Sequence, residues 1–176
     1  MAALLMVTPA SVFAKDDGSS EEVNIVYTHD IHSFLEYKKD QEQINAAAKL
    51  KSYIDSEKQK KEATFVVDAG DFSMGTLYGT GFQTEALELM TLGRLGYDAV
   101  TLGNHEFDFG PEGLTAMFQT AVAKSKASPD IQMPLMVQSN IDWHKSTDSK
   151  AQDLKKAMSD YGVLPYAIVE KDLINA

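Results

Sequence analysis

The segment 103–108, Gly-Asn-His-Glu-Phe-Asp, gathers an amide, an imidazole and two carboxylates. It directly follows the apolar run 99–102, which is typical of the end of a buried strand. Asp30 with His32, and Asp71, follow apolar runs of the same kind. Carboxylate, imidazole and amide oxygen donors suit Mn²⁺, Zn²⁺, Fe or Mg²⁺. These residues are therefore candidates for a metal site.

The elements that must position these residues alternate along the chain between β-branched runs and amphipathic stretches. We predict strands at 23–28, 64–67, 97–102, 135–139 and 166–169. We predict helices over 41–61, from an N-cap at Thr84 to Gly96, and from Gly110-Pro111 onward. The polar segment 142–159 is predicted to be a loop with a short helix. This alternation predicts an α/β domain around a largely parallel sheet.

The polar motifs are expected to meet at one edge of this sheet. In parallel α/β sheets, ligands bind beyond the carboxyl ends of the strands. Asp30 and His32 follow the first predicted strand and Asp71 follows the second. The segment 104–108 follows the third. If residues 30–32 are extended, the side chains of Asp30 and His32 point to the same side and can bind one cation.

Three segments together resemble the opening motifs of the 5′-nucleotidase family, which belongs to the calcineurin-like metallophosphoesterases. They are Thr-His-Asp-Ile-His at 28–32, Gly-Asp-x-x-x-Gly-Thr at 70–76 and Gly-Asn-His-Glu-Phe-Asp at 103–108. The resemblance covers about residues 23–140. It implies a four-layer α-β-β-α sandwich with two divalent metal ions at the strand ends. Residues 23–176 would form the N-terminal portion of this domain, incomplete at the C-terminus.

The resemblance also implies a metal ligand at each of four positions. Asp30 and His32 resemble ligands of the first metal. Asp71 resembles the carboxylate that bridges both metals, and Asn104 resembles a ligand of the second metal through its amide oxygen. Two cations about 3.5–4 Å apart can activate a water and stabilise an in-line displacement at phosphorus.

Two further motif residues resemble the catalytic pair of the family. His105 resembles the histidine that contacts the phosphoryl group and helps the leaving oxygen, and Asp108 resembles the partner that holds its imidazole. A carboxylate bonded to His105 would favour the imidazolium, which suits both roles. Glu106 is expected to be structural or to support these direct contacts.

The chain departs from the family pattern in three places. His29 stands where the family usually has Asn, and Ser33 where it often has Gly. Neither change removes a motif ligand. Beyond Asp108 the chain has only His144 and lacks the Gly-His-x-His segment that completes the family's metal site. We therefore interpret the chain as the N-terminal part of a longer enzyme and expect little phosphatase activity from residues 15–176 alone.

The resemblance implies a secreted 5′-nucleotidase-like hydrolase that acts on a small-molecule phosphoester. A 2′,3′-cyclic nucleotide phosphodiesterase, a sugar-nucleotide hydrolase or a sulfur-ester hydrolase on the same scaffold are alternatives. A non-catalytic surface protein that uses the fold for binding is another. The glycines at 75, 79 and 81 do not form a phosphate-binding loop, because no Gly-Lys-Ser/Thr follows them.

Composition limits the partners and the compartment. The net charge of −10 argues against non-specific nucleic-acid binding. The absence of Cys excludes a disulfide scaffold and a thiol nucleophile. Residues 1–14 resemble a signal peptide that lacks its basic start, and they are too short to span a membrane. With a disordered leader at 15–22, we expect a secreted, periplasmic or cell-surface protein.

Overall fold

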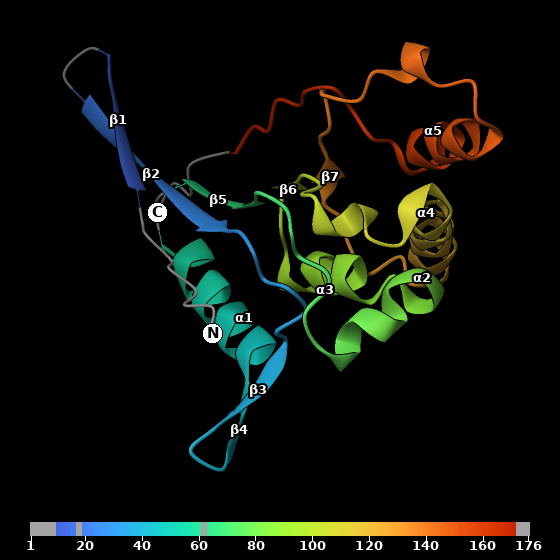
Figure 1. The fold of residues 1–176 in the computed structure, drawn as a ribbon. Helices are drawn as coiled ribbons and strands as arrows, with labels where there is room; N and C mark the ends of the chain where they lie inside the picture. Colours follow the sequence, from blue (N-terminus) through green and yellow to red (C-terminus); the bar gives the residue numbers. More distant parts are fainter. Residues whose placement is uncertain (1–9, 17–18, 61–62, 172–176) are drawn as a thin grey trace.

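A computed structural model of the protein describes residues 10–16, 19–60 and 63–171. Its main feature is a five-stranded sheet in the order β1-β2-β5-β6-β7 (Figure 1). The strands are β1 (Ala10–Asp16), β2 (Ser19–Thr28), β5 (Ala63–Asp68), β6 (Ala99–Val100) and β7 (Leu135–Met136). β2, β5, β6 and β7 pair in parallel, and β1 pairs with β2 antiparallel at the edge. The predicted α/β class with a largely parallel sheet is confirmed.

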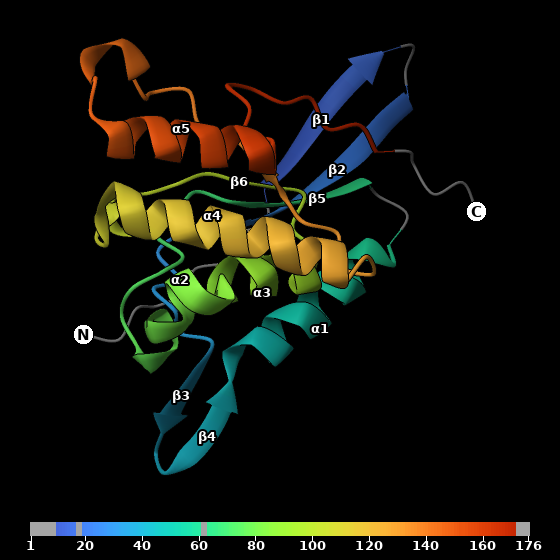
Figure 2. The same ribbon diagram turned by 90° about the vertical axis from the view of Figure 1, so that its right-hand side faces the viewer.

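Five helices and a hairpin accompany the sheet within these described ranges. The helices are α1 (Ala46–Lys58), α2 (Phe82–Glu85), α3 (Leu87–Leu95), α4 (Gly110–Ala127) and α5 (Ser149–Tyr161). Short 3₁₀ turns lie at Leu77–Gly81, His105–Phe107 and Trp143–Lys145. The hairpin consists of β3 (Glu36–Lys39) and β4 (Glu42–Asn45). Figures 1 and 2 show α4 and α5 side by side, and the hairpin projecting from the start of α1.

The core lies on one face of the sheet. Val26 pairs with Val66, and Val100 pairs with Met136, and all four side chains are at most 2% exposed. Side chains alternate between the two faces along a strand, so the neighbours of these residues lie on the other face. There Ile25, Phe65 and Val67 are only half-buried. The helices therefore cover one side of the sheet far better than the other.

The hairpin is the first place where the structure differs from the prediction. The predicted helix 41–61 begins at Ala46, because Glu42–Asn45 pairs with Glu36–Lys39 as β4. The hairpin turn Asp40-Gln41 has positive φ at both residues, 49° and 71°. This matches the type I′ turn that joins two-residue hairpins. Asn45 then caps α1, since its side chain accepts a hydrogen bond from the backbone N–H of Ala48.

The helices that follow β5 also differ in detail. Thr84 lies inside α2 and caps no helix, because Ala86 adopts a left-handed conformation that separates α2 from α3. Gly96 ends α3 with a φ of 86°, as predicted. The polar segment 142–159 contains a longer helix than expected, since α5 has thirteen residues. Its apolar face buries Leu154 and Met158.

The last predicted strand, 166–169, is wrong: these residues form no strand in the part of the chain that the structure describes. The chain pairs with the sheet only at Leu164, which bridges Val137 in parallel. Pro165 follows directly and has no N–H to continue the ladder. Tyr166 and Ile168 are consequently 74% and 80% exposed.

The N-terminal region has more regular structure than we expected. Apart from residues 17–18, which lie outside the described residues, the predicted leader 15–22 belongs to β1 and β2. Residues 1–9 of the predicted signal peptide also lie outside the described residues, so this peptide stays a prediction. No helix in the described ranges has the length and apolar character needed to cross a membrane.

A buried carboxylate ends β5, next to the loops described below. Asp68 is 4% exposed, and its two oxygens accept hydrogen bonds from the Thr28 hydroxyl (2.6 Å) and the Gly70 N–H (2.9 Å). Burial raises the pKa of Asp68 to about 6, although both hydrogen bonds oppose the shift. The unfolded chain should titrate this group near its ordinary value of 3.8. Between these two values the folded state binds more protons than the unfolded state, so the stability contribution of Asp68 falls as the pH rises.

We expect Asp68→Asn to remove this pH dependence. Above pH 6 the ionised carboxylate costs the folded state about 3 kcal/mol, which the amide avoids. The amide can donate to the Thr28 oxygen while Thr28 donates to Tyr97, whose hydroxyl lies 2.7 Å away.

The measurement is urea unfolding at pH 4 and pH 7. The free energy of unfolding of the variant minus that of wild type should increase from pH 4 to pH 7. Asp130→Asn, at an exposed site, is the control and should show no such rise. Equal pH slopes for Asp68→Asn and wild type would contradict the prediction.

Candidate metal centre

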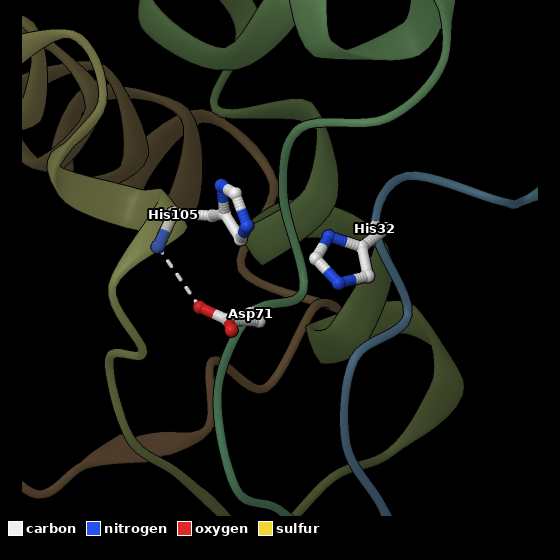
Figure 3. Close-up of side chains that lie close together, drawn as sticks. All are labelled: His32, Asp71 and His105. Atoms are coloured by element: carbon white, nitrogen blue, oxygen red, sulfur yellow. Dashed lines mark hydrogen bonds between the residues drawn. The ribbon is translucent and has the colours of Figure 1, made fainter. Parts of the chain in front are cut away.

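Three loops meet at the carboxyl edge of the parallel sheet. They follow β2, β5 and β6 and carry His32, Asp71 and His105 respectively. One ligand atom from each of these side chains lies within 4.8 Å of the other two. Figure 3 shows the two imidazoles turned toward each other above the Asp71 carboxylate. The predicted convergence of the three loops is therefore present.

Contacts join Asp71 to His105 and His105 to His32. The Asp71 Oδ1 atom accepts a hydrogen bond of 2.9 Å from the backbone N–H of His105, drawn dashed in Figure 3. The rings of His32 and His105 are 4.9 Å apart between centroids and meet edge to face. The backbone of the third loop thus fixes the carboxylate of the second.

The hydrogen bonds of His32 determine which of its nitrogens can bind a metal. Its Nδ1 lies 3.0 Å from the carbonyl oxygen of Met74, an acceptor, so Nδ1 carries the proton in this contact. Nε2 is then free of its proton in the neutral imidazole. Metal-binding histidines are commonly oriented by such a bond on the other nitrogen.

Asp30 lies beside the group of three rather than within it. Its Oδ1 is 3.3 Å from Nε2 of His32, and its Oδ2 forms a short hydrogen bond with Nδ1 of His29. The hydrogen bond from His29 holds the pKa of Asp30 below its ordinary value. His29, which stands where the family usually has Asn, therefore orients the neighbouring carboxylate of Asp30. The sequence did not indicate this role.

The predicted pair of His105 and Asp108 is present. Nδ1 of His105 lies 2.7 Å from Oδ2 of Asp108, and this hydrogen bond raises the pKa of His105. Both side chains are partly exposed, at 38% and 41%. Asn104 is also exposed and precedes the 3₁₀ turn without capping it. The Asn104 side-chain amide thus forms no capping hydrogen bond to the turn.

The backbone of the site loops is unusual. Five non-glycine residues in the loops after β2 and β5 have φ between 50° and 64°: Asp30, His32, Ser33, Asp71 and Met74. The extended conformation expected for residues 30–32 is therefore wrong. Hydrogen bonds between the loops fix this backbone, from the N–H of Asp30 to Gly70 O and from the N–H of His32 to Asp71 O, both at 3.0 Å.

Two glycines let the second and third loops approach closely. A Cβ on Gly70 would lie 2.4 Å from the backbone nitrogen of Gly103. A Cβ on Gly103 would lie 2.1 Å from Oδ1 of Asp71. Neither distance is compatible with a side chain. Gly70 and Gly103 are therefore needed for the close contact between these loops.

The remaining departures from the motif pattern are accommodated away from the ligands. Ser33 is fully buried, and its hydroxyl donates a 2.6 Å hydrogen bond to Oε1 of Glu88, a residue of α3. His144 is exposed in the Trp143–Lys145 turn, and it is not part of the cluster of His32, Asp71 and His105. No sequence pattern indicated the Ser33 contact, because Glu88 lies 55 residues further along the chain.

The residues at this edge suit a divalent cation. The cluster offers two imidazoles and the Asp71 carboxylate, with the Asp30 carboxylate beside it, a donor set that suits Mn²⁺, Zn²⁺ or Fe. Nε2 of His32 lies 3.3 Å from Oδ1 of Asp30, and a ligand atom of Asp71 lies within 4.8 Å of one on His32. The predicted number of ions, two, stays a prediction.

Comparison with known proteins agrees with this geometry. No family model matches the chain. It is 34% identical to the 5′-nucleotidase of Rattus norvegicus over 120 residues, which is 63% of the chain and 20% of that protein. It is 37% identical to the Bos taurus 5′-nucleotidase over 102 residues, which is 53% of the chain and 17% of that protein.

A solved structure extends the match to most of the fold. The crystal structure of the 5′-nucleotidase precursor from Thermus thermophilus superposes with a TM-score of 0.57 at 27% identity. The match covers 84% of this chain and 26% of that one. The chain spans about a fifth of the length of the curated relatives it matches. Together with the three motif loops at one sheet edge, these similarities support the 5′-nucleotidase family of metallophosphoesterases for this chain, which matches the N-terminal part of its relatives.

Proposed function

We propose that the complete gene product is a metal-dependent phosphoester hydrolase that releases phosphate from nucleotides. The observation that carries the proposal is the cluster of His32, Asp71 and His105 at the ends of three parallel strands. The names of the similar proteins support a nucleotide as the substrate. The acidic net charge of −10 favours a small-molecule phosphoester over nucleic acid.

In this proposal, Asp30, His32, Asp71 and Asn104 hold two divalent ions, whether Mn, Zn, Fe or Mg. When bound, such ions would activate water and neutralise charge that develops on the phosphoryl oxygens. With Nδ1 of His32 donating to the Met74 carbonyl, Nε2 would be the nitrogen that binds a cation. Asp71 contributes its charge at the centre of the group, where its Oδ1 is fixed by the His105 N–H.

His105 has a different role from His32, although both lie in the same cluster. Its Nδ1 is bonded to Asp108, which raises the pKa of His105 and favours the protonated ring. A protonated imidazole is a poor metal ligand but a good partner for a phosphoryl oxygen. Nε2 of His105 can then donate its proton to the leaving oxygen, and Asp108 keeps the ring in position.

The proposal also includes a location outside the cytoplasm. Residues 1–14 have the apolar composition and the small residues before a cleavage site that a signal peptide has. The protein would then be secreted, periplasmic or held at the cell surface. A phosphohydrolase in this position would act on nucleotides before uptake.

We expect the complete gene product, freed of metal by a chelator, to regain AMP hydrolysis when Mn²⁺ is added. His105→Ala should reduce kcat about 10²–10⁴-fold, because it removes the proton donor. Phosphate release from AMP and from 2′,3′-cyclic AMP measures the activity and its selectivity. His144→Ala, an exposed histidine outside the cluster, is the matched control and should keep full activity. Hydrolysis that is independent of metal, or full activity of His105→Ala, would refute the proposed function.

A further inference from the structure

We propose that Glu106 is a positioning residue that holds the Asp71 loop and the His105 loop at a fixed separation. The inference rests on the proposed function, since it concerns the geometry of the same metal centre. Glu106 lies between Asn104, His105 and Asp108 in sequence, yet its side chain points away from solvent and is 0% exposed. Its carboxylate therefore lies in the interior, where it can contact the loops that carry the candidate ligands.

The contacts of this carboxylate join two loops. Oε2 accepts hydrogen bonds from the backbone N–H of Gly103 (2.7 Å) and of Asp71 (3.0 Å). Oε1 accepts from the N–H (2.9 Å) and the hydroxyl (2.8 Å) of Ser73. One side chain thus satisfies three backbone donors, one in its own loop and two in the loop after β5. In the loop after β5, these bonds hold the candidate ligand Asp71 at its own N–H and at Ser73, two residues further on.

The chemistry of these bonds requires a carboxylate. All four partners are donors, and a carboxylate offers acceptors at both oxygens. In glutamine of the same shape, one oxygen becomes an NH₂ group that faces either the N–H groups of Asp71 and Gly103 or the donors of Ser73. A buried donor facing donors costs the full desolvation of these groups. Glutamine at position 106 should therefore separate the two loops.

Glu88 provides a matched comparison nearby. It is also a buried glutamate, at 2% exposure, but it accepts one side-chain hydrogen bond, from the Ser33 hydroxyl to Oε1. Its Oε2 has no partner among the described residues. Glutamine at position 88 keeps the acceptor that Ser33 uses. The same substitution is thus disruptive at Glu106 and tolerable at Glu88.

The test compares Glu106→Gln, Glu106→Asp and Glu88→Gln in the complete gene product. Mn²⁺ affinity is measured by electron paramagnetic resonance titration with the metal alone, at a temperature where each variant is folded. We expect Glu106→Gln to weaken Mn²⁺ binding about 10–100-fold, as is typical when a residue that orients a ligand is lost. Glu106→Asp, which keeps the charge, should recover part of the affinity. Glu88→Gln should stay within about twofold of wild type.

Amide hydrogen exchange gives a second readout that does not need the metal. The N–H groups of Asp71 and Gly103 should exchange faster in Glu106→Gln than in wild type, and at the wild-type rate in Glu88→Gln. Unchanged Mn²⁺ affinity and unchanged exchange in folded Glu106→Gln would overturn the proposal. If Glu106→Gln does not fold, the same two measurements on Glu106→Asp decide it. If the wild-type complete gene product binds no Mn²⁺, the metal site of the proposed function fails, and the exchange rates alone decide the role of Glu106.

Discussion

Replacing Asp71 by asparagine is expected to reduce metal-dependent phosphate release by the complete gene product about a thousandfold. Asp71 supplies the negative charge between two imidazoles that come from the other two loops. A metal contributes several kcal/mol of charge stabilisation at phosphorus, and each 1.36 kcal/mol is a factor of about ten in rate. Asparagine is isosteric, and its oxygen can still accept the hydrogen bond from the His105 N–H. The loss would therefore be one of charge, with the loop structure kept.

The measurement is kcat for AMP hydrolysis at saturating Mn²⁺, with circular dichroism to show that the variant is folded. Asp130→Asn removes a charge from an exposed loop and serves as the control, which should keep the wild-type rate. Excess Mn²⁺ should restore little of the activity of Asp71→Asn, because the site lacks a ligand. An activity within about tenfold of wild type would show that Asp71 does not have the proposed central role.

Alanine at position 103 is expected to have an effect nearly as large, about a hundredfold on turnover, although it adds only one methyl group. The new Cβ would lie 2.1 Å from Oδ1 and 2.5 Å from the backbone nitrogen of Asp71. Real Cβ contacts are essentially never shorter than 3.0 Å, so the Asp71 loop must move. A displacement of about 1 Å in a catalytic group can cost about a hundredfold in rate. Overpacking should also lower the free energy of unfolding by about 1–3 kcal/mol.

Gly79→Ala is the matched control for this substitution. Gly79 is also buried, in the 3₁₀ turn Leu77–Gly81, but its Cβ would meet its nearest neighbour, Met74 Cα, at an ordinary 3.7 Å. It should therefore keep both activity and stability. Parallel measurements of AMP turnover and urea unfolding on the two variants separate steric displacement from a general intolerance of alanine. Wild-type turnover in Gly103→Ala would mean that the Asp71 loop can move without functional cost.

The meeting of the three loops could be predicted because it depends on local patterns. Each β-branched run ends where a polar motif begins, and parallel strands bring these ends to one edge. The pairing of His105 with Asp108 followed from the motif resemblance, and the structure contains it. No long-range contact had to be known for either expectation.

The supporting contacts could not be predicted, because they join residues far apart in sequence. The Met74 carbonyl that sets the proton position of His32 is 42 residues away. The donors of Asp71 and Ser73 that meet Glu106 are 33 to 35 residues away. A glutamate inside a polar motif has the same appearance in sequence whether it is exposed or fully buried.

Two errors of secondary structure have identifiable causes, one local and one tertiary. The hairpin at Glu36–Asn45 was missed because Gln41 is not a residue that normally favours positive φ, although it has a φ of 71°. Its charged residues also resemble a helix surface. The length of α5 was underestimated, because its apolar residues are few and their burial follows from contact with α4.

The left-handed residues of the site loops have a consequence for the evolution of the chain. A non-glycine residue in this conformation costs about 1–2 kcal/mol, and glycine would relieve much of that cost. Asp30, His32 and Asp71 nevertheless occupy such positions. Selection for thermal stability alone would drive all three toward glycine and erase the site. At these positions the residue that would be most stable differs from the residue that the chemistry needs. The side chains of Asp30, His32 and Asp71 are kept at a cost in stability.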